Sequence, residues 1–101
     1  MKEVFQFQRL YIGIDVSKLT LDVCFISGAG TNHYQRFDNS KAGQRSLHKW
    51  LLQQEGFTYA AALFCMEHTG LYTRPLVEFL LLQSARVWME SALHLKRSTK
   101  A

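Results

Sequence analysis

The sequence has no apolar run long enough to cross a membrane, and this absence sets a first limit on its function. A membrane helix needs ~20 consecutive apolar residues, whereas the longest run here, residues 76–82, is interrupted by Glu78. Residues 1–9 are mixed and polar and lack the pattern of a signal peptide. We therefore expect no membrane partner and a location in the cytoplasm.

Cysteine and proline are also scarce. The only cysteines are Cys24 and Cys65, without the Cys-x-x-Cys spacing of a zinc site. Each stands inside an apolar, strand-like run, so we interpret both as small core side chains. There is no repeat, low-complexity stretch or internal linker, and 101 residues suit one domain. We expect that domain over residues 1–101, with a leader over 1–9 and the start of a further helix over 90–101.

Basic residues only slightly outnumber acidic residues. The formal net charge is +4, which permits nucleic-acid binding without requiring it. Lys96, Arg97 and Lys100 crowd the end of the chain, where they suit either a solvated helix end or a segment that contacts phosphates. The second interpretation predicts weak nucleic-acid binding that falls as salt rises.

Periodicity changes along the chain from strand-like to helical. Residues 10–16 and 21–27 read as strands joined by a short polar connection, and residues 33–37 as a third strand. A helix capped by Asn39 or Ser40 should follow and end near Gly56. The later expected elements are a central strand buried on both faces over 59–66, a helix with Pro75 in its first turn and continuing to Gln83, a fifth strand over 85–89 and a third helix over 93–100.

The resulting order, β-β-β-α-β-α-β-α, is that of the RNase H-like (RuvC-like) α/β fold, with a mixed five-stranded sheet and flanking helices. In that fold the first strand lies at the centre of the sheet beside the fourth strand, and the fifth strand extends the far side. Trp50, Phe57, Phe64, Phe79 and Trp88 fall in apolar periodic runs, so we expect them in the core.

Two carboxylates stand out by position. Asp15 lies near the end of the first strand, and Glu67 follows directly after the apolar run that ends at Met66. If these strands are neighbours, their backbones lie ~5 Å apart, and both acids can reach one magnesium ion, which prefers carboxylate oxygens. Two surface acids at turns remain the alternative. Asp22 should face away from buried Leu21 and Val23, toward solvent.

Smaller signals surround these acids. His68 can orient a water or contact a phosphate, or simply finish a turn. Thr69 and Gly70 should turn the chain into the next helix. Gly13 within a strand indicates close backbone approach or relief of packing.

The stretch Tyr-Ile-Gly-Ile-Asp15-Val-Ser-Lys18 resembles the opening of the DEDD insertion-sequence transposases of the one-ten type, relatives of the Piv and MooV recombinases. Glu67-His-Thr69-Gly-Leu-Tyr resembles their second acidic motif, Glu-x-Thr-Gly-x-Tyr. The similarity extends over residues 10–101, including Phe37, Asn39, Gly43, Leu47, Leu51, Pro75, Leu76 and residues 89–98. Ser91-Ala92 stands where many relatives have Asn-Pro.

The resemblance implies a RuvC-like domain with four metal-binding acids, of which Asp15 matches the first and Glu67 the second. It implies Mg²⁺ or Mn²⁺ as cofactor, DNA as partner, a guide RNA for the full-length protein and catalysis of DNA transposition and recombination. Lys18, His68 and Thr69 lie in the matched motifs as supporting residues. The last two acids and a serine-bearing domain should follow residue 101. We therefore expect this chain alone to be an inactive fragment of a transposase.

Two other functions stay open at this point. One is a non-catalytic domain that binds nucleic acid or a partner chain, including another copy of itself. The other is a fragment of a sugar kinase or actin-like ATPase, whose fold also opens with a hairpin bearing Gly-x-Asp. Residues 16–18 are a poor substitute for the Gly- and Thr-rich phosphate turn of that fold. Stabilisation by nucleotide would favour the kinase, and stabilisation by divalent metal alone would favour the transposase.

Overall fold

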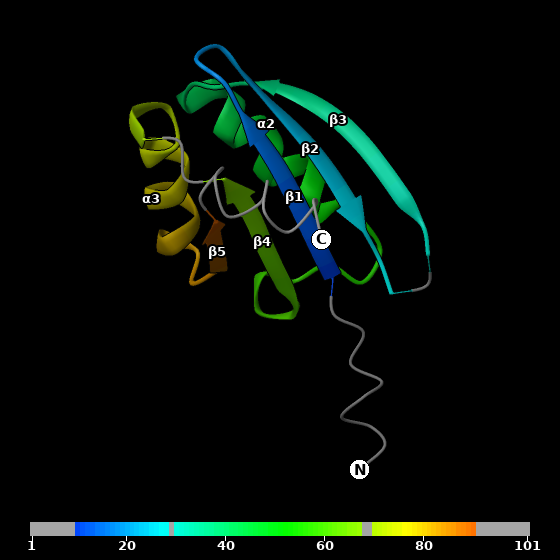
Figure 1. Ribbon diagram of the computed structural model, residues 1–101. Coiled ribbons are helices and arrows are strands. Elements are labelled where there is room, and N and C mark those ends of the chain that lie inside the picture. The colour runs from blue at the N-terminus through cyan, green and yellow to red at the C-terminus, as the bar shows by residue number, and fades with distance from the viewer. Residues whose placement is uncertain (1–9, 29, 68–69, 91–101) are drawn as a thin grey trace, which may run out of the picture.

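The structure, a computed structural model, describes residues 10–28, 30–67 and 70–90, which form a mixed sheet with two helices packed against one of its faces (Figure 1). The strands are β1 (Leu10–Val16), β2 (Thr20–Ile26), β3 (Asn32–Asp38), β4 (Ala62–Glu67) and β5 (Arg86–Glu90), and the helices are α2 (Lys41–Leu52) and α3 (Arg74–Leu82). No helix in these residues is long and apolar enough to cross a membrane.

The strand order is β3-β2-β1-β4-β5, with β1 at the centre. Strands β1, β2 and β3 form an antiparallel meander, whereas β4 pairs parallel to β1 and β5 pairs parallel to β4. This is the predicted RNase H-like arrangement, with the first and fourth strands as neighbours. The carboxyl ends of β1 and β4 therefore lie at the same edge of the sheet.

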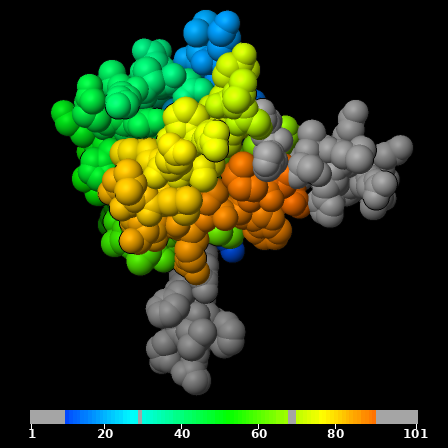
Figure 2. All heavy atoms as spheres, turned by 90° about the vertical axis from the view of Figure 1, so that its left-hand side faces the viewer, coloured from blue at the N-terminus to red at the C-terminus, as the bar shows by residue number. Residues whose placement is uncertain are grey.

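The core occupies a single layer between the sheet and the helices. Alternation within β1 buries Leu10, Ile12 and Ile14 on the helical side, because successive side chains of a strand point to opposite faces. One cluster joins these residues to the buried leucines of the helices, Leu47, Leu51, Leu76 and Leu80. Figure 2 shows α3 (yellow) and β5 (orange) side by side on one side of the molecule.

Local chemistry explains where the helices begin. The Ser40 side chain accepts a hydrogen bond from the Gly43 amide at 3.0 Å, which satisfies one of the amides left unpaired at the start of α2. In α3, Pro75 stands at the first turn, where its missing N–H costs nothing. The predicted cap at Ser40 and the predicted position of Pro75 are confirmed.

Several predicted boundaries are wrong. The fourth strand begins at Ala62 and not at residue 59, because Tyr59–Ala61 forms a 3-10 turn, in which the Thr58 side chain accepts a hydrogen bond from the Ala61 amide. Its burial alternates, so it is not buried on both faces. Helix α2 ends at Leu52, with further turns before Gly56, and α3 stops one residue before Gln83. The predicted leader and third helix lie outside the described residues.

Candidate functional site

Asp15 lies on the face of the sheet opposite the core. Its neighbour Ile14 is buried against the helices, so the strand's alternation turns Asp15 to the other face, where it is exposed. Exposure removes the cost of burying a charge within an apolar strand. In the described residues the Asp15 carboxylate has neither an ion pair nor a hydrogen bond with another side chain.

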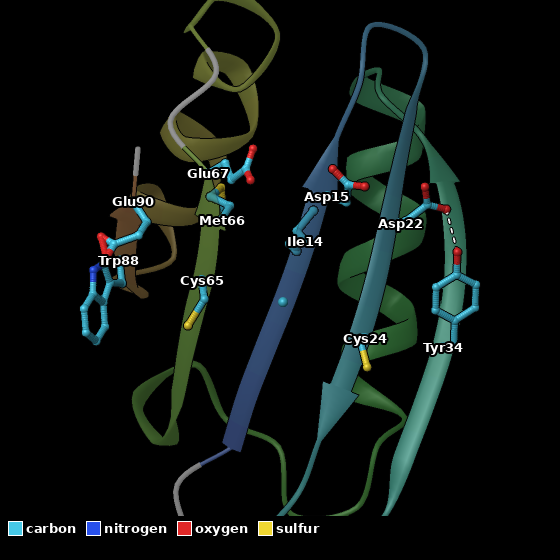
Figure 3. A pocket seen from close by; sticks show the side chains of 11 residues that line it. Ile14, Asp15, Asp22, Cys24, Tyr34, Cys65, Met66, Glu67, Trp88 and Glu90 are labelled. Atoms are coloured by element: carbon cyan, nitrogen blue, oxygen red, sulfur yellow. Dashed lines mark hydrogen bonds between the residues drawn. The ribbon is translucent and has the colours of Figure 1, made fainter. Parts of the chain in front are cut away.

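Glu67 lies on the same face, at the end of the neighbouring strand. Gly13 of β1 is the register partner of Cys65 in parallel β4, and Asp15 and Glu67 each follow two residues later. Both carboxylates line one hollow, and Figure 3 shows them on adjacent strands above that face. The sheet therefore brings the two predicted acids to one edge. Their sharing of a metal ion stays a prediction.

Two further acids continue this row across the sheet. Asp22 is the direct register partner of Asp15, and Glu90 is the direct partner of Glu67. All four line the same hollow. The prediction that Asp22 faces away from the core is confirmed, but it lies beside Asp15 and not in plain solvent, with its side chain 23% exposed. Counting residues back from the hairpin turn could have revealed this pairing.

Asp22 is held by two donors from β3. Tyr34 donates its hydroxyl proton to Oδ1 of Asp22 at 2.8 Å, and Nε of Arg36 donates to the same oxygen at 2.7 Å (Figure 3 draws the first bond). The bond from Arg36, followed by that from Tyr34, lowers the pKa of Asp22 from its ordinary value. The hydrogen bond from Tyr34 to Asp22 also raises the pKa of the Tyr34 hydroxyl. Asp22 is therefore an anion with a defined orientation.

The lowered pKa of Asp22 predicts a pH effect on stability. A carboxyl group whose pKa is lower in the folded state stabilises the fold above its unfolded pKa of about 3.8, and this contribution is lost as the pH falls through the lower folded value. The difference in urea midpoint between wild type and Asp22→Asn should therefore shrink between neutral pH and pH values below about 3.8. A difference independent of pH would show that the carboxylate bonds do not favour folding.

The hollow on this face has a volume of about 780 Å³ and an apolar floor beside the acids. Gly13 lies between Cys24 and Cys65 in the register, and a Cβ added to Gly13 would meet nothing within 4 Å. Gly13 thus leaves space, and within the described part of the chain neither of the two predicted reasons for a glycine, close backbone approach or relief of packing, finds a neighbouring atom. Trp88, the register partner of Cys65, stands beside them on β5.

Two predictions of burial on this face are also wrong. Cys24 and Cys65 are half-buried residues that line the hollow and not core residues, and Trp88 is 55% exposed. The reason is the same for all three: each points away from the only face of the sheet that the described helices cover. Burial raises the pKa of the Cys65 thiol, which disfavours the thiolate form needed to bind a metal.

The remaining predicted residues are not assembled with these acids. Lys18 lies in the turn between β1 and β2 and lines a different hollow, near Lys41 and Tyr72. His68 and Thr69 lie outside the described residues, as does the basic cluster of Lys96, Arg97 and Lys100. Within residues 10–28, 30–67 and 70–90, no three His, Cys, Asp or Glu side chains are arranged to hold a metal ion together.

Comparison with known families gives a match that covers most of the chain. The model of a transposase family, the IS110-type DEDD transposases, matches residues 12–101. The match begins within β1 and includes Asp15 and Glu67. None of the curated proteins compared with the chain matches it.

Proposed function

The chain belongs to the family of IS110-type DEDD transposases, and we propose from this that it forms the part of a DNA transposase in which Asp15 and Glu67 hold a divalent metal ion, Mg²⁺ or Mn²⁺. The intact enzyme would cleave and transfer DNA strands during transposition and site-specific recombination. A guide RNA partner of the full-length protein belongs to the same proposal and comes from the resemblance of the sequence motifs. Self-association of the chain stays a separate prediction.

The observation that carries the proposal is the pairing of β1 with β4. It places Asp15 and Glu67, the residues that match the first two acids of the family pattern, on one face at one edge of the sheet. The donor set fits a hard cation, since carboxylate oxygens are the ligands that Mg²⁺ prefers, together with waters and substrate phosphates. Both carboxylates are exposed at the hollow and uncommitted to partners in the described residues.

Each part of the site has a separate task. The two carboxylates would bind and orient the ion, which when bound supplies positive charge and Lewis-acid polarisation at a phosphodiester. The sheet fixes both strands through backbone hydrogen bonds, so the acids need no loop to position them. Asp15 and Glu67 would supply two of the family's four acids, and DNA cleavage would also require the remaining pair.

The kinase-like alternative is disfavoured by the turn after Asp15. Only residues 17–19 separate β1 from β2, and the Ser17 hydroxyl is bonded to the backbone and hydroxyl group of Thr20. This hydroxyl closes the hairpin and is not presented to a phosphate. A nucleotide bound at this turn would have to break those hydrogen bonds.

The test is metal-dependent thermal stability of the chain. We expect Mn²⁺ or Mg²⁺ to raise the midpoint temperature of unfolding of the wild type. At a metal concentration ten times the dissociation constant, the free energy of unfolding should increase by about 1.4 kcal/mol. Asp15→Asn and Glu67→Gln should abolish this shift, because each removes a charged ligand. ATP without metal should produce no shift.

Glu55→Gln provides the matched control. It removes one carboxylate outside the hollow, from the turns that follow α2, and should leave the metal-dependent shift intact. A shift that survives in both Asp15→Asn and Glu67→Gln, or no shift in the wild type at millimolar metal, would refute the proposed metal site.

A further inference from the structure

Asp15 and Asp22 stand directly opposite each other on neighbouring antiparallel strands. Like charges at directly opposed positions destabilise a sheet, so an arrangement with both acids ionised needs a compensating charge. Arg36 supplies one, because it is the register partner of Asp22 on β3 and forms an ion pair with it at 2.7 Å. The row of acids therefore ends, on the β3 side, in a single positive charge.

Arg36 is oriented and still open to a ligand. Its Nε bonds Oδ1 of Asp22, and the Tyr34 hydroxyl bonds the same oxygen, so the guanidinium is held from one side. Its side chain is 64% exposed, and apart from the nearby Tyr34 hydroxyl, which also interacts with the guanidinium, its two terminal nitrogens have no hydrogen-bond partner in the described part of the chain. A guanidinium with free terminal nitrogens is suited to a phosphate, which it can contact through two parallel hydrogen bonds.

The position of Arg36 relative to Asp15 selects the ligand. Both lie on the face away from the helices, two strands apart, which corresponds to ~10 Å between their backbones. The four acids of the row would repel a phosphate chain, whereas Arg36 would attract it at the row's end. If a nucleic-acid strand approaches a metal ion at Asp15, Arg36 is the positively charged side chain at the end of this row that can contact one of its phosphates.

We propose that Arg36 binds a backbone phosphate of the DNA strand that lies over Asp15, and that Asp22 and Tyr34 are positioning residues that aim its guanidinium. This inference rests on the proposed function, because it takes DNA as the ligand of this face. The competing explanation is an exposed ion pair that contributes little to stability and nothing to binding.

The first experiment compares Arg36→Gln with Arg45→Gln. Both remove one positive charge, but Arg45 is exposed on α2, on the helical side of the sheet. Binding of a fluorescein-labelled DNA oligonucleotide is measured by anisotropy over a range of salt concentrations with Mg²⁺ present. For Arg36→Gln we expect about tenfold weaker binding at low salt, and a slope of log affinity against log salt that is shallower by about 0.9 for a duplex or 0.7 for a single strand. Arg45→Gln should keep the wild-type slope.

The second experiment separates positioning from general electrostatics. Asp22→Ala removes a negative charge near the DNA together with the oxygen that accepts from Arg36 and Tyr34, so an unspecific electrostatic effect would tighten binding. If Asp22 aims Arg36, the same substitution should weaken binding instead. Tyr34→Phe changes no charge and keeps the ring, and it should weaken binding by less than Asp22→Ala because the bond from Arg36 to Asp22 remains.

Circular dichroism and the unfolding midpoint of each variant establish that it is folded. Equal losses in Arg36→Gln and Arg45→Gln, tighter binding by Asp22→Ala, or no binding by the wild type at low salt would each overturn the inference. The proposed metal site is judged separately, by the Asp15-dependent thermal shift measured without DNA. The prediction for Arg36 can therefore be wrong while the proposed metal site is supported, and the proposed metal site can be refuted while the phosphate contact is supported.

Discussion

Replacement of Phe64 by alanine is expected to lower the free energy of unfolding by about 3–5 kcal/mol, the usual cost of removing a buried aromatic ring. Phe64 is fully buried at the middle of β4, paired in register with Ile12 on β1 and Val87 on β5. Its ring stacks on Tyr59 with centroids 5.9 Å apart. A domain of this size has only about 5–15 kcal/mol of stability, so the variant should lose a large share of the free energy of unfolding. Urea denaturation followed by circular dichroism measures the loss.

Trp88→Ala is the contrasting variant, one strand away. Trp88 is 55% exposed on the face away from the helices, so its loss should cost less than about 1 kcal/mol. Phe64 and Trp88 were both predicted to be core residues because each falls in an apolar periodic run. A difference in stability between the two variants would therefore reflect the burial seen in the structure, which the sequence pattern does not distinguish. Comparable destabilisation by both substitutions would mean that Trp88 is covered in the folded protein.

Gly43→Ala is expected to destabilise the protein by about 3 kcal/mol through a backbone clash. A Cβ at position 43 would lie 1.7 Å from the carbonyl oxygen of Asp38 and 2.6 Å from its carbonyl carbon. Neither atom can rotate away, since both belong to the backbone at the end of β3. The first turn of α2 would have to separate from the sheet, which would also weaken the Ser40 cap on the Gly43 amide. Thermal unfolding of the purified variant provides the measurement.

The control for this substitution is Gly13→Ala. It makes the same chemical change in β1, where the added methyl group would meet nothing within 4 Å, and it should leave the unfolding midpoint almost unchanged or slightly higher because alanine restricts the unfolded chain. If Gly43→Ala is as well tolerated as Gly13→Ala, α2 does not approach β3 as closely as the structure indicates.

Much of the candidate site was predictable from local features. Asp15 is an acid inside an alternating β-branched strand, and Glu67 follows an apolar run directly, so each is marked by its immediate neighbours. Asp22 and Arg36 have no such local mark. Their place in the site follows only from the register of β2 against β1 and β3. This register brings Asp22 and Arg36, which are 14 residues apart in the sequence, into a hydrogen-bonded pair.

The sequence by itself determined the order of the described strands and helices from β1 to β5, the two matched acids and the inward-facing side chains of β1 and β2, because these follow from short-range periodicity and from motif spacing. Only the tertiary structure decided which face of the sheet the helices cover. That choice leaves Trp88, Cys24 and Cys65 lining a hollow although their neighbours in sequence are apolar. It also places Asp22 beside Asp15. The physical reason is that a strand's own pattern distinguishes its two faces, whereas the partners across each face come from strands and helices distant in the sequence.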